Sequence, residues 1–239
     1  MSVYNVYMSN VSVVIPAWNE EKYLHDALDA IERQTVQPIE VIVVDNNSID
    51  NTAEIASKRG AKVVKETVQG ITAARNAGFN AAKGAIIART DADTHVPPHW
   101  IEEIINVFDQ DSDIVGVSGP TTFFDLEAKS TNRGGSKLFA NIYVHLARLI
   151  HGHEILIGPN MAVRKSAWEK IKMNVDLDDS HVHEDIDLAY NLSKVGILKF
   201  DSELVVEISS RRIKYNPKSF FIDYAMKHKP GLVRHLKSL

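Results

Sequence analysis

Short apolar segments alternate with longer helical patterns along the N-terminal part of the chain. Each apolar segment and the helical pattern after it occupy residues 11–15 and 20–34, 39–44 and 49–59, 62–64 and 71–83, and 85–88 and 98–108. This alternation is typical of βαβ units, in which helices connect neighbouring parallel strands. The apolar segments are continuous, as expected for strands that helices cover on both faces. The sequence therefore predicts an α/β fold with a doubly wound, mostly parallel sheet flanked by helices.

Three of the predicted strands end in polar residues, at 18–20, 45–48 and 91–93. In doubly wound sheets the ligand binds beyond the carboxyl ends of the strands, so we expect these tips to converge on one crevice. Asp91 and Asp93 stand one residue apart where an apolar strand opens to solvent. Mg²⁺ and Mn²⁺ prefer oxygen ligands and keep positions open for substrate phosphates. The pair predicts a metal–diphosphate site and a nucleotide-linked substrate, although the triplet alone leaves an ordinary solvated turn open.

The neighbouring tips offer groups for a nucleotide. Asp45, at the end of its strand, can accept a hydrogen bond from a nucleobase N–H, with a turn-forming aspartate as the alternative. Arg75 follows Gly70 near the start of a predicted helix, where a guanidinium and the helix N-terminus both favour phosphate; a plain surface residue is the alternative. No Gly-x-Gly-x-x-Gly motif follows the first strand and no Gly-Lys-Ser/Thr loop is present, so Rossmann dinucleotide binding and a P-loop are not supported.

Three acids at the start of a later helical pattern form a second candidate cluster: Glu184, Asp185 and Asp187. Acids in the first turn stabilise a helix through its dipole, which accounts for about one or two of them. A carboxylate can instead act as a general base when it lies within hydrogen-bond reach of a hydroxyl. Spacing alone leaves both roles open for Asp185.

The composition limits the chemistry and the location. The chain contains no cysteine, which excludes disulfides, thiolate nucleophiles and zinc sites with cysteine ligands. Its 239 residues, 44% of them hydrophobic, are enough for one substantial core. No apolar run approaches the roughly 18 residues of a membrane span, and residues 1–10 lack a signal region, so we expect a soluble, cytoplasmic protein.

Positive charge is concentrated at the C-terminus. Residues 211–239 carry a net charge of +7 and the remainder −11, so we divide the chain into a main domain, 1–210, which contains the candidate site, and a basic, aromatic-containing helical tail, 211–239. The tail is either a solvated helix packed on the domain or a peripheral contact to the anionic inner face of a membrane. Nucleic acid is not expected as a partner, because the body is acidic and no nucleic-acid-binding motif is present.

In these motifs the chain resembles the family 2 glycosyltransferases, which are inverting enzymes of the GT-A fold. The resemblance extends from Val11 to about Glu207. Five motifs carry it, in the family's order: residues 13–20, 43–48, 70–76, 91–93 and 183–188. It implies an enzyme that moves a sugar from a nucleotide-sugar donor to a hydroxyl of a glycan or lipid-linked acceptor, with Mn²⁺ or Mg²⁺ as cofactor.

The resemblance also implies roles for individual residues. It assigns Pro16, Ala17, Asn19, Glu20, Asp45, Arg75 and Asp91 to the nucleotide, Asp93 to the metal, Gly158, Asn160 and Glu184 to the donor sugar and acceptor, and Asp185 to catalysis as the general base. The family often has a second acid where Asn46 stands, and it often continues into a membrane segment or an aromatic-basic motif where this chain has Arg211 and Arg212.

Two other classes stay open: a nucleotidyltransferase, which usually builds a glycine-rich phosphate loop after the first strand, and a catalytically silent sugar-nucleotide binding protein.

Overall fold

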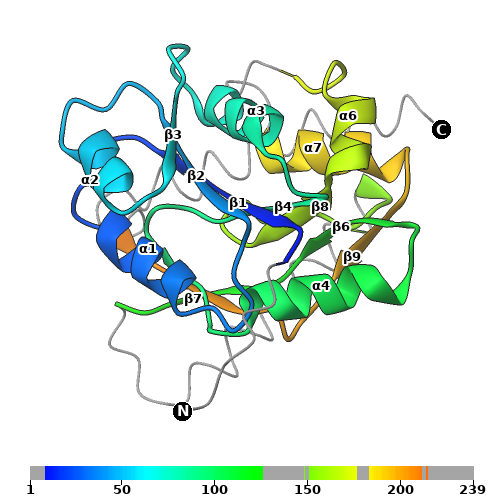
Figure 1. Cartoon of the computed structure of the whole chain (residues 1–239). Helices are drawn as coiled ribbons and strands as arrows, with labels where there is room; N and C mark the ends of the chain where they lie inside the picture. Colours follow the sequence, from blue (N-terminus) through cyan, green and yellow to red (C-terminus); the bar gives the residue numbers. More distant parts are fainter. Residues whose placement is uncertain (1–8, 126–147, 149–150, 177–182, 212–213, 215–239) are drawn as a thin grey trace.

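A seven-stranded mixed sheet forms the centre of the molecule (Figure 1). The computed structural model describes residues 9–125, 148, 151–176, 183–211 and 214. The strands, in spatial order, are β3 (Lys62–Lys65), β2 (Glu40–Asp45), β1 (Val11–Ala17), β4 (Ile86–Arg89), β8 (Met161–Arg164), β6 (Ile114–Ser118) and β9 (Ile197–Phe200). All neighbouring strands are parallel except β8, which runs antiparallel to both β4 and β6. The predicted doubly wound, mostly parallel sheet is confirmed.

Helices cover both faces of this sheet. One core cluster joins the strands to α1 (Leu24–Glu32), α2 (Thr52–Lys58) and α4 (Trp100–Gln110). The other cluster joins them to α3 (Ile71–Ala81), α6 (Lys165–Ile171) and α7 (Glu184–Ser193). Figure 1 shows α1 and α4 below the sheet and α3, α6 and α7 above it.

The central strand β1 explains why the predicted strands were continuous apolar runs. All seven of its residues are buried. Val13 and Ile15 belong to the first core cluster and Val14 to the second, because successive side chains of a strand point to opposite faces. Helix α3 packs so closely that a Cβ at Gly78 would lie 2.3 Å from Cγ1 of Val14. A glycine at this position is therefore required by the close approach of helix and strand.

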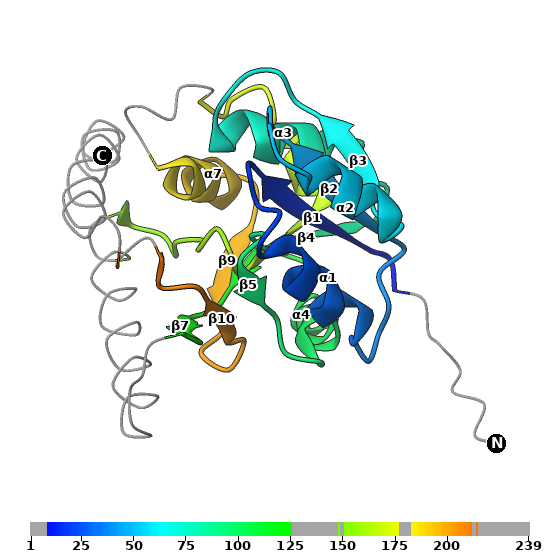
Figure 2. The ribbon, with the colours of Figure 1, turned by 90° about the vertical axis from the view of Figure 1, so that its left-hand side faces the viewer.

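A second, three-stranded sheet was not predicted. Strand β10 (Val206–Ile208) pairs antiparallel with β5 (Thr94–His95) and parallel with β7 (Thr121–Phe123). Figure 2 shows β10 beside β5 and β7. Since β5 directly follows Asp93, this pairing brings residues 209–211 next to that aspartate, and the Ser209 N–H donates to the Asp93 carbonyl oxygen at 3.1 Å. The small sheet thus places residues 209–211 beside the acidic residues that follow β4.

The observed elements differ from the predicted ones mainly at their ends. Helix α1 covers 24–32 of the predicted 20–34, and α4 covers 100–110 where 98–108 was predicted. No helix in the described part of the chain is long and apolar enough to cross a membrane. Apart from Arg211 and Lys214, the predicted tail lies outside the described residues, so the boundary after residue 210 and the helical tail stay predictions.

Candidate functional site

A cavity of about 620 Å³ opens at the carboxyl ends of the central strands. Its walls come from the ends of β1, β2 and β4, from the first turn of α3 and from the segment after β10. Five of the predicted site residues line it: Pro16, Ala17, Glu20, Asp91 and Asp93. Residues that were not individually assigned to the site also line it, among them Trp18 and Asn46 from the predicted strand tips, Gly70 and Arg211. The expected convergence of strand tips on one crevice is therefore present in the structure.

Two predicted nucleotide contacts, Asn19 and Asp45, join the loops that follow β1 and β2. Asn19 adopts a left-handed backbone conformation with φ of 56°, and its Oδ1 accepts a hydrogen bond from the Ile49 N–H at 2.9 Å. Oδ1 of Asp45 accepts from the Ser48 N–H, three residues further along the chain, at 3.0 Å. Neither residue lines the cavity. Their contacts to a nucleotide stay predictions, while the structure gives both a role in shaping the cavity wall.

Asn46 attaches the loop before α3 to the end of β2. Its Nδ2 donates to the carbonyl oxygens of Glu66 and Val68 at 2.9 and 2.7 Å, and its Oδ1 accepts from the Gly70 N–H at 2.9 Å. Gly70 has φ of 143°, which only glycine adopts readily, and α3 begins at the next residue. Asn46 thus fixes where the N-terminus of α3 meets the cavity, a role that an acid at this position could not fill with the same donors.

The acidic half of the cavity consists of Glu20, Asp91 and Asp93. The Arg211 guanidinium forms an ion pair with Glu20 and a second one from its Nε to Oδ2 of Asp93 at 2.8 Å. The other carboxylate oxygen of Glu20, Oε2, is buried and has no hydrogen-bond partner. Desolvation and the neighbouring Asp91 carboxylate raise the pKa of Asp93 to about 6, against the attraction of Arg211. The three carboxylates therefore share this half of the cavity with a single guanidinium.

The donor set fits a hard divalent cation. Its side-chain atoms are carboxylate oxygens, and the unpartnered Oε2 of Glu20 offers one that the protein itself does not use. Among the described residues, no three His, Cys, Asp or Glu side chains are grouped to hold a metal by themselves. Mg²⁺ and Mn²⁺ are usually held by one or two carboxylates together with substrate phosphates and water. The residues present suit that mode of binding.

Behind the cavity, Glu184 lies between two buried arginines. Its Oε2 is 2.6 Å from Nη1 of Arg75, and its Oε1 accepts a hydrogen bond from Nη1 of Arg89. Arg89 also reaches Oδ1 of Asp91 at 3.2 Å. Desolvation acts to raise the pKa of Glu184, but the two guanidinium groups outweigh it and hold the pKa below its usual value. Arg89 was not predicted as a site residue, although a charged residue at the end of an apolar strand can indicate a site.

Arg75 is enclosed and does not line the cavity. Its side chain is fully buried, and its Nε and Nη2 donate to Oδ1 of Asn76 at 3.0 and 2.9 Å. Its predicted contact to the nucleotide stays a prediction. The structure instead gives it, with Arg89, the task of holding Glu184 at the start of α7.

Asp185 is half-buried beside this cluster, at the N-terminus of α7. Desolvation and the adjacent Glu184 carboxylate raise the pKa of Asp185 to about 7. Arg89 and hydrogen bonds from the backbone N–H groups of Ile186 and Gly158 oppose this rise. A carboxyl group that titrates near neutral pH is suited to accept a proton during catalysis.

The segment before β8 contributes Gly158 and Asn160. A Cβ at Gly158 would lie 3.1 Å from Nη2 of Arg89, so this glycine allows the backbone to approach the arginine cluster. Asn160 is fully buried: its Nδ2 donates to the Leu204 carbonyl oxygen at 2.6 Å and its Oδ1 accepts from Nε1 of Trp100 at 2.9 Å. The roles of both residues at the donor sugar or acceptor stay predictions, and Asn160 has a packing role in this structure.

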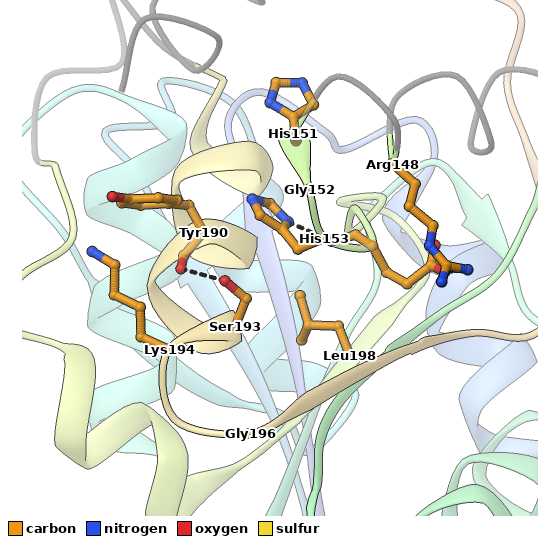
Figure 3. A pocket seen from close by; sticks show the side chains of 10 residues that line it. Arg148, His151, Gly152, His153, Tyr190, Ser193, Lys194, Gly196 and Leu198 are labelled. Carbon is orange, nitrogen blue, oxygen red and sulfur yellow. Dashed lines mark hydrogen bonds and ion pairs between the residues drawn. The ribbon is translucent and has the colours of Figure 1, made fainter. Parts of the chain in front are cut away.

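A second cavity, of about 500 Å³, lies at the opposite end of α7 from Asp185 (Figure 3). It contains none of the predicted site residues. Nη1 of Arg148 pairs with Oε1 of Glu154 at 2.9 Å, and Nζ of Lys194 lies 3.8 Å from the centre of the Tyr190 ring. Its charged groups therefore already have partners, and we place the candidate site at the strand ends.

Comparison with protein families matches residues 12–172 to the model described as "Glycosyl transferase family 2". An uncharacterized glycosyltransferase of Nostoc, alr2836, is 33% identical over 53% of this chain and 41% of its own length. RP339, an uncharacterized glycosyltransferase of Rickettsia prowazekii, is 29% identical over 85% of this chain and 64% of its own. A transferase of Serratia proteamaculans, named undecaprenyl-phosphate 4-deoxy-4-formamido-L-arabinose transferase, is 35% identical over 46% and 36%. The chain spans less than two thirds of the length of these relatives.

Solved structures share the fold. The mannosyltransferase PcManGT of Pyrobaculum calidifontis, in complex with GDP-Man and Mn²⁺, superposes with a TM-score of 0.67 at 22% identity, over 97% of this chain and 64% of that one. Glucosyl-3-phosphoglycerate synthase of Mycobacterium tuberculosis, in complex with Mn²⁺, UDP and glucosyl-3-phosphoglycerate, gives 0.59 at 21% identity, over 82% and 70%. At these identities the likeness concerns the arrangement of strands and helices.

Proposed function

Because the chain belongs to glycosyl transferase family 2, we propose that it is an inverting, metal-dependent glycosyltransferase that moves a sugar from a nucleotide-sugar donor to an acceptor hydroxyl. One observation carries the proposal. Arg89 contacts both Asp91 and Glu184, so it links the acidic cavity at the end of β4 to the half-buried Asp185 at the start of α7. These contacts support assigning a cation-binding group and a candidate base, far apart in the sequence, to one site.

The proposed reaction is a single displacement at the anomeric carbon. The acceptor oxygen forms the new glycosidic bond as the bond to the nucleotide diphosphate breaks, and the hydroxyl proton passes to the Asp185 carboxylate. Such a step needs one base and no protein nucleophile. A pKa of about 7 leaves Asp185 ionised above neutral pH and still basic enough to accept that proton. Asp185 therefore serves as the general base.

The leaving diphosphate needs charge neutralisation. Asp93, with Glu20 and Asp91 beside it, would hold the divalent cation, which neutralises the diphosphate and acts as a Lewis acid when bound. The first turn of α3 lines the same cavity, and a helix N-terminus also favours phosphate. The Mn²⁺ complexes of the two structural relatives support a donor of this class.

The acceptor is proposed to be a glycan or lipid-linked hydroxyl. The Serratia relative carries undecaprenyl-phosphate in its name, which supports a lipid-linked acceptor. The net charge of +7 in residues 211–239 supports a cytoplasmic enzyme that contacts the anionic inner membrane face through that tail. Co-sedimentation of the full chain with anionic vesicles tests this contact, and no binding at low salt would contradict it.

A calorimetric titration with UDP-, GDP- and dTDP-sugars tests the donor site. We expect one of them to bind in the presence of Mn²⁺, and we expect Asp93→Ala to abolish that binding. Asp26→Ala is the matched control, because Asp26 is an exposed acid on α1 away from the cavity. Failure of all three donors to bind folded protein would contradict the proposal.

Turnover separates this function from its alternatives. Asp185→Asn should bind the donor and fail to transfer the sugar. A silent binding protein would show no turnover in the unmodified chain either. Release of diphosphate from a nucleoside triphosphate and a sugar phosphate would instead identify a nucleotidyltransferase.

A further inference from the structure

The Arg211 side chain occupies the acidic half of the donor cavity. Its Nε lies 2.8 Å from Oδ2 of Asp93, and its Nη2 pairs with Oε1 of Glu20. The guanidinium also lies over the Tyr23 ring, 4.4 Å from the ring centre. One cation from the C-terminal segment therefore bridges the two carboxylates that the proposed function assigns to the metal and the donor.

The backbone before Arg211 is fixed independently of its side chain. The Ser209 N–H donates to the Asp93 carbonyl oxygen, and Oγ of Ser209 donates to Oδ2 of Asp125 at 3.0 Å. The Ser210 N–H donates to Oδ1 of Asp125 at 2.7 Å. The long arginine side chain can therefore leave the cavity by rotating about its own bonds, while residues 209 and 210 stay in place.

A metal ion at this site and the Arg211 guanidinium compete for the same two carboxylates. The ion pairs of Arg211 use Oδ2 of Asp93 and Oε1 of Glu20, which leaves Oε2 of Glu20 buried without a partner. Two cations on the same pair of carboxylates repel each other strongly in a partly enclosed site. A metal that binds Asp93 in this geometry must therefore displace the guanidinium.

We propose that Arg211 is a built-in stand-in cation: its guanidinium occupies the metal subsite while the donor is absent and is displaced when metal and nucleotide enter together. The inference rests on the proposed donor site. Its consequence is that metal alone binds weakly, because it must first break both ion pairs. The donor's phosphates offer the displaced guanidinium a new anionic partner, so nucleotide promotes metal binding.

Electron paramagnetic resonance of free Mn²⁺, in a titration of the nucleotide-free full chain, measures the competition directly. We expect Arg211→Gln to bind Mn²⁺ about tenfold more tightly than the unmodified chain, as when the competent state rises from a tenth to most of the population. Lys214→Gln is the matched control, because Lys214 lies in the same segment but pairs with Asp125 outside the cavity. Its Mn²⁺ affinity should be unchanged.

A second comparison protects the test against loss of folding. Arg211→Lys keeps a cation that can pair with one carboxylate at a time, so its Mn²⁺ affinity should lie between those of the unmodified chain and Arg211→Gln. Adding UDP or GDP, whichever the chain binds, should raise the Mn²⁺ affinity of both proteins, because the phosphates are metal ligands, and by a larger factor in the unmodified chain than in Arg211→Gln. Thermal unfolding of each variant verifies that it is folded.

The outcomes distinguish the inference from the proposed function. Nucleotide-promoted Mn²⁺ binding that is the same in the unmodified chain and in Arg211→Gln overturns the stand-in role and leaves the donor site intact. Absence of Mn²⁺ binding in every folded variant, with UDP, GDP or dTDP, overturns both.

Discussion

Two glutamates show how differently this chain treats a carboxylate near its candidate site. Both carboxylate oxygens of Glu184 are held by buried arginines, Arg75 and Arg89. Glu20 shares the single, partly exposed Arg211 with Asp93 and keeps one buried oxygen without a partner. The Glu184 cluster is closed and saturated by the protein itself. The Glu20 cluster is satisfied only in part, which is what a site for an exchangeable cation requires.

The difference follows from where the arginines come from. Arg75 and Arg89 lie on α3 and β4, which the core fixes in place, and neither side chain exposes more than 2% of its surface. Arg211 follows β10, at the edge of the described fold, and its side chain is 28% exposed. We therefore expect the closed cluster to hold Glu184 firmly beside Asp185, and the open cluster to exchange its cation.

The largest expected effect is the loss of kcat on substitution of Asp185, which lies next to the closed cluster. Asp185→Asn should lower kcat by about 10²–10⁴-fold, because the amide cannot accept the proton of the acceptor hydroxyl. Donor binding should stay unchanged, because the cavity residues are untouched. Steady-state kinetics and calorimetry on the same preparation measure both quantities. A kcat that stays within a few-fold of the unmodified enzyme would remove Asp185 from catalysis.

The second prediction compares the stability of the two clusters. Arg89→Met should lower the free energy of unfolding by about 3–5 kcal/mol, because it leaves a buried carboxylate with one partner fewer. Arg211→Met should cost about 1 kcal/mol or less, because that ion pair is partly exposed. Urea denaturation followed by circular dichroism measures both.

Lys58→Met serves as the surface control for this pair. Lys58 pairs with Glu54 on the exposed face of α2, and both side chains are more than half exposed. We expect its loss to be undetectable or nearly so. Equal costs for Arg89→Met and Arg211→Met would break the distinction between a closed and an open cluster.

We also expect kcat to depend on pH. Asp185 must be ionised to act as a base, so kcat should fall by about tenfold for each pH unit below its pKa of about 7. Desolvation and the Glu184 carboxylate raise the pKa of Asp185, while Arg89 and two backbone N–H groups lower it. Glu184→Gln should therefore move the acidic limb of the profile to lower pH. The electrostatic coupling would be contradicted if the acidic limb of the kcat profile stayed in place, or moved to higher pH, in a folded Glu184→Gln variant.

The sequence was sufficient to predict those parts of the fold and of the candidate site that contiguous residues form. The Val and Ile runs of β1 and β2 and the helices after them are formed by contiguous residues, and their ends were predicted to within a few positions. Asp91 and Asp93 could be placed at the cavity because they follow the end of β4 directly. Any parallel strand brings the residues after it to the same edge of the sheet.

What could not be predicted depends on pairing across long sequence distances. Arg89 meets Glu184 from 95 residues away, and Arg211 meets Glu20 from 191 residues away. The pairing of β10 with β5, which delivers Arg211, joins two very short strands that carry no distinctive pattern. Arg75 could be recognised as important near the start of its helix, but whether it faced a ligand or Glu184 depended on the packing of α7.

The smallest expected effect tests the open cluster at its own glutamate. Glu20→Gln keeps the shape of the side chain and an oxygen that can accept a hydrogen bond from Arg211, but it removes one negative charge. We expect the free energy of unfolding to change by less than about 1 kcal/mol, because a partly exposed ion pair contributes little. The lost charge also relieves repulsion, since Glu20 acts to raise the pKa of Asp93. Thermal unfolding of Glu20→Gln beside Glu184→Gln gives the comparison directly. If the two substitutions lower the stability equally, the cavity carboxylates stabilise the fold as Glu184 does. Arg211 is then a fixed structural partner rather than an exchangeable cation.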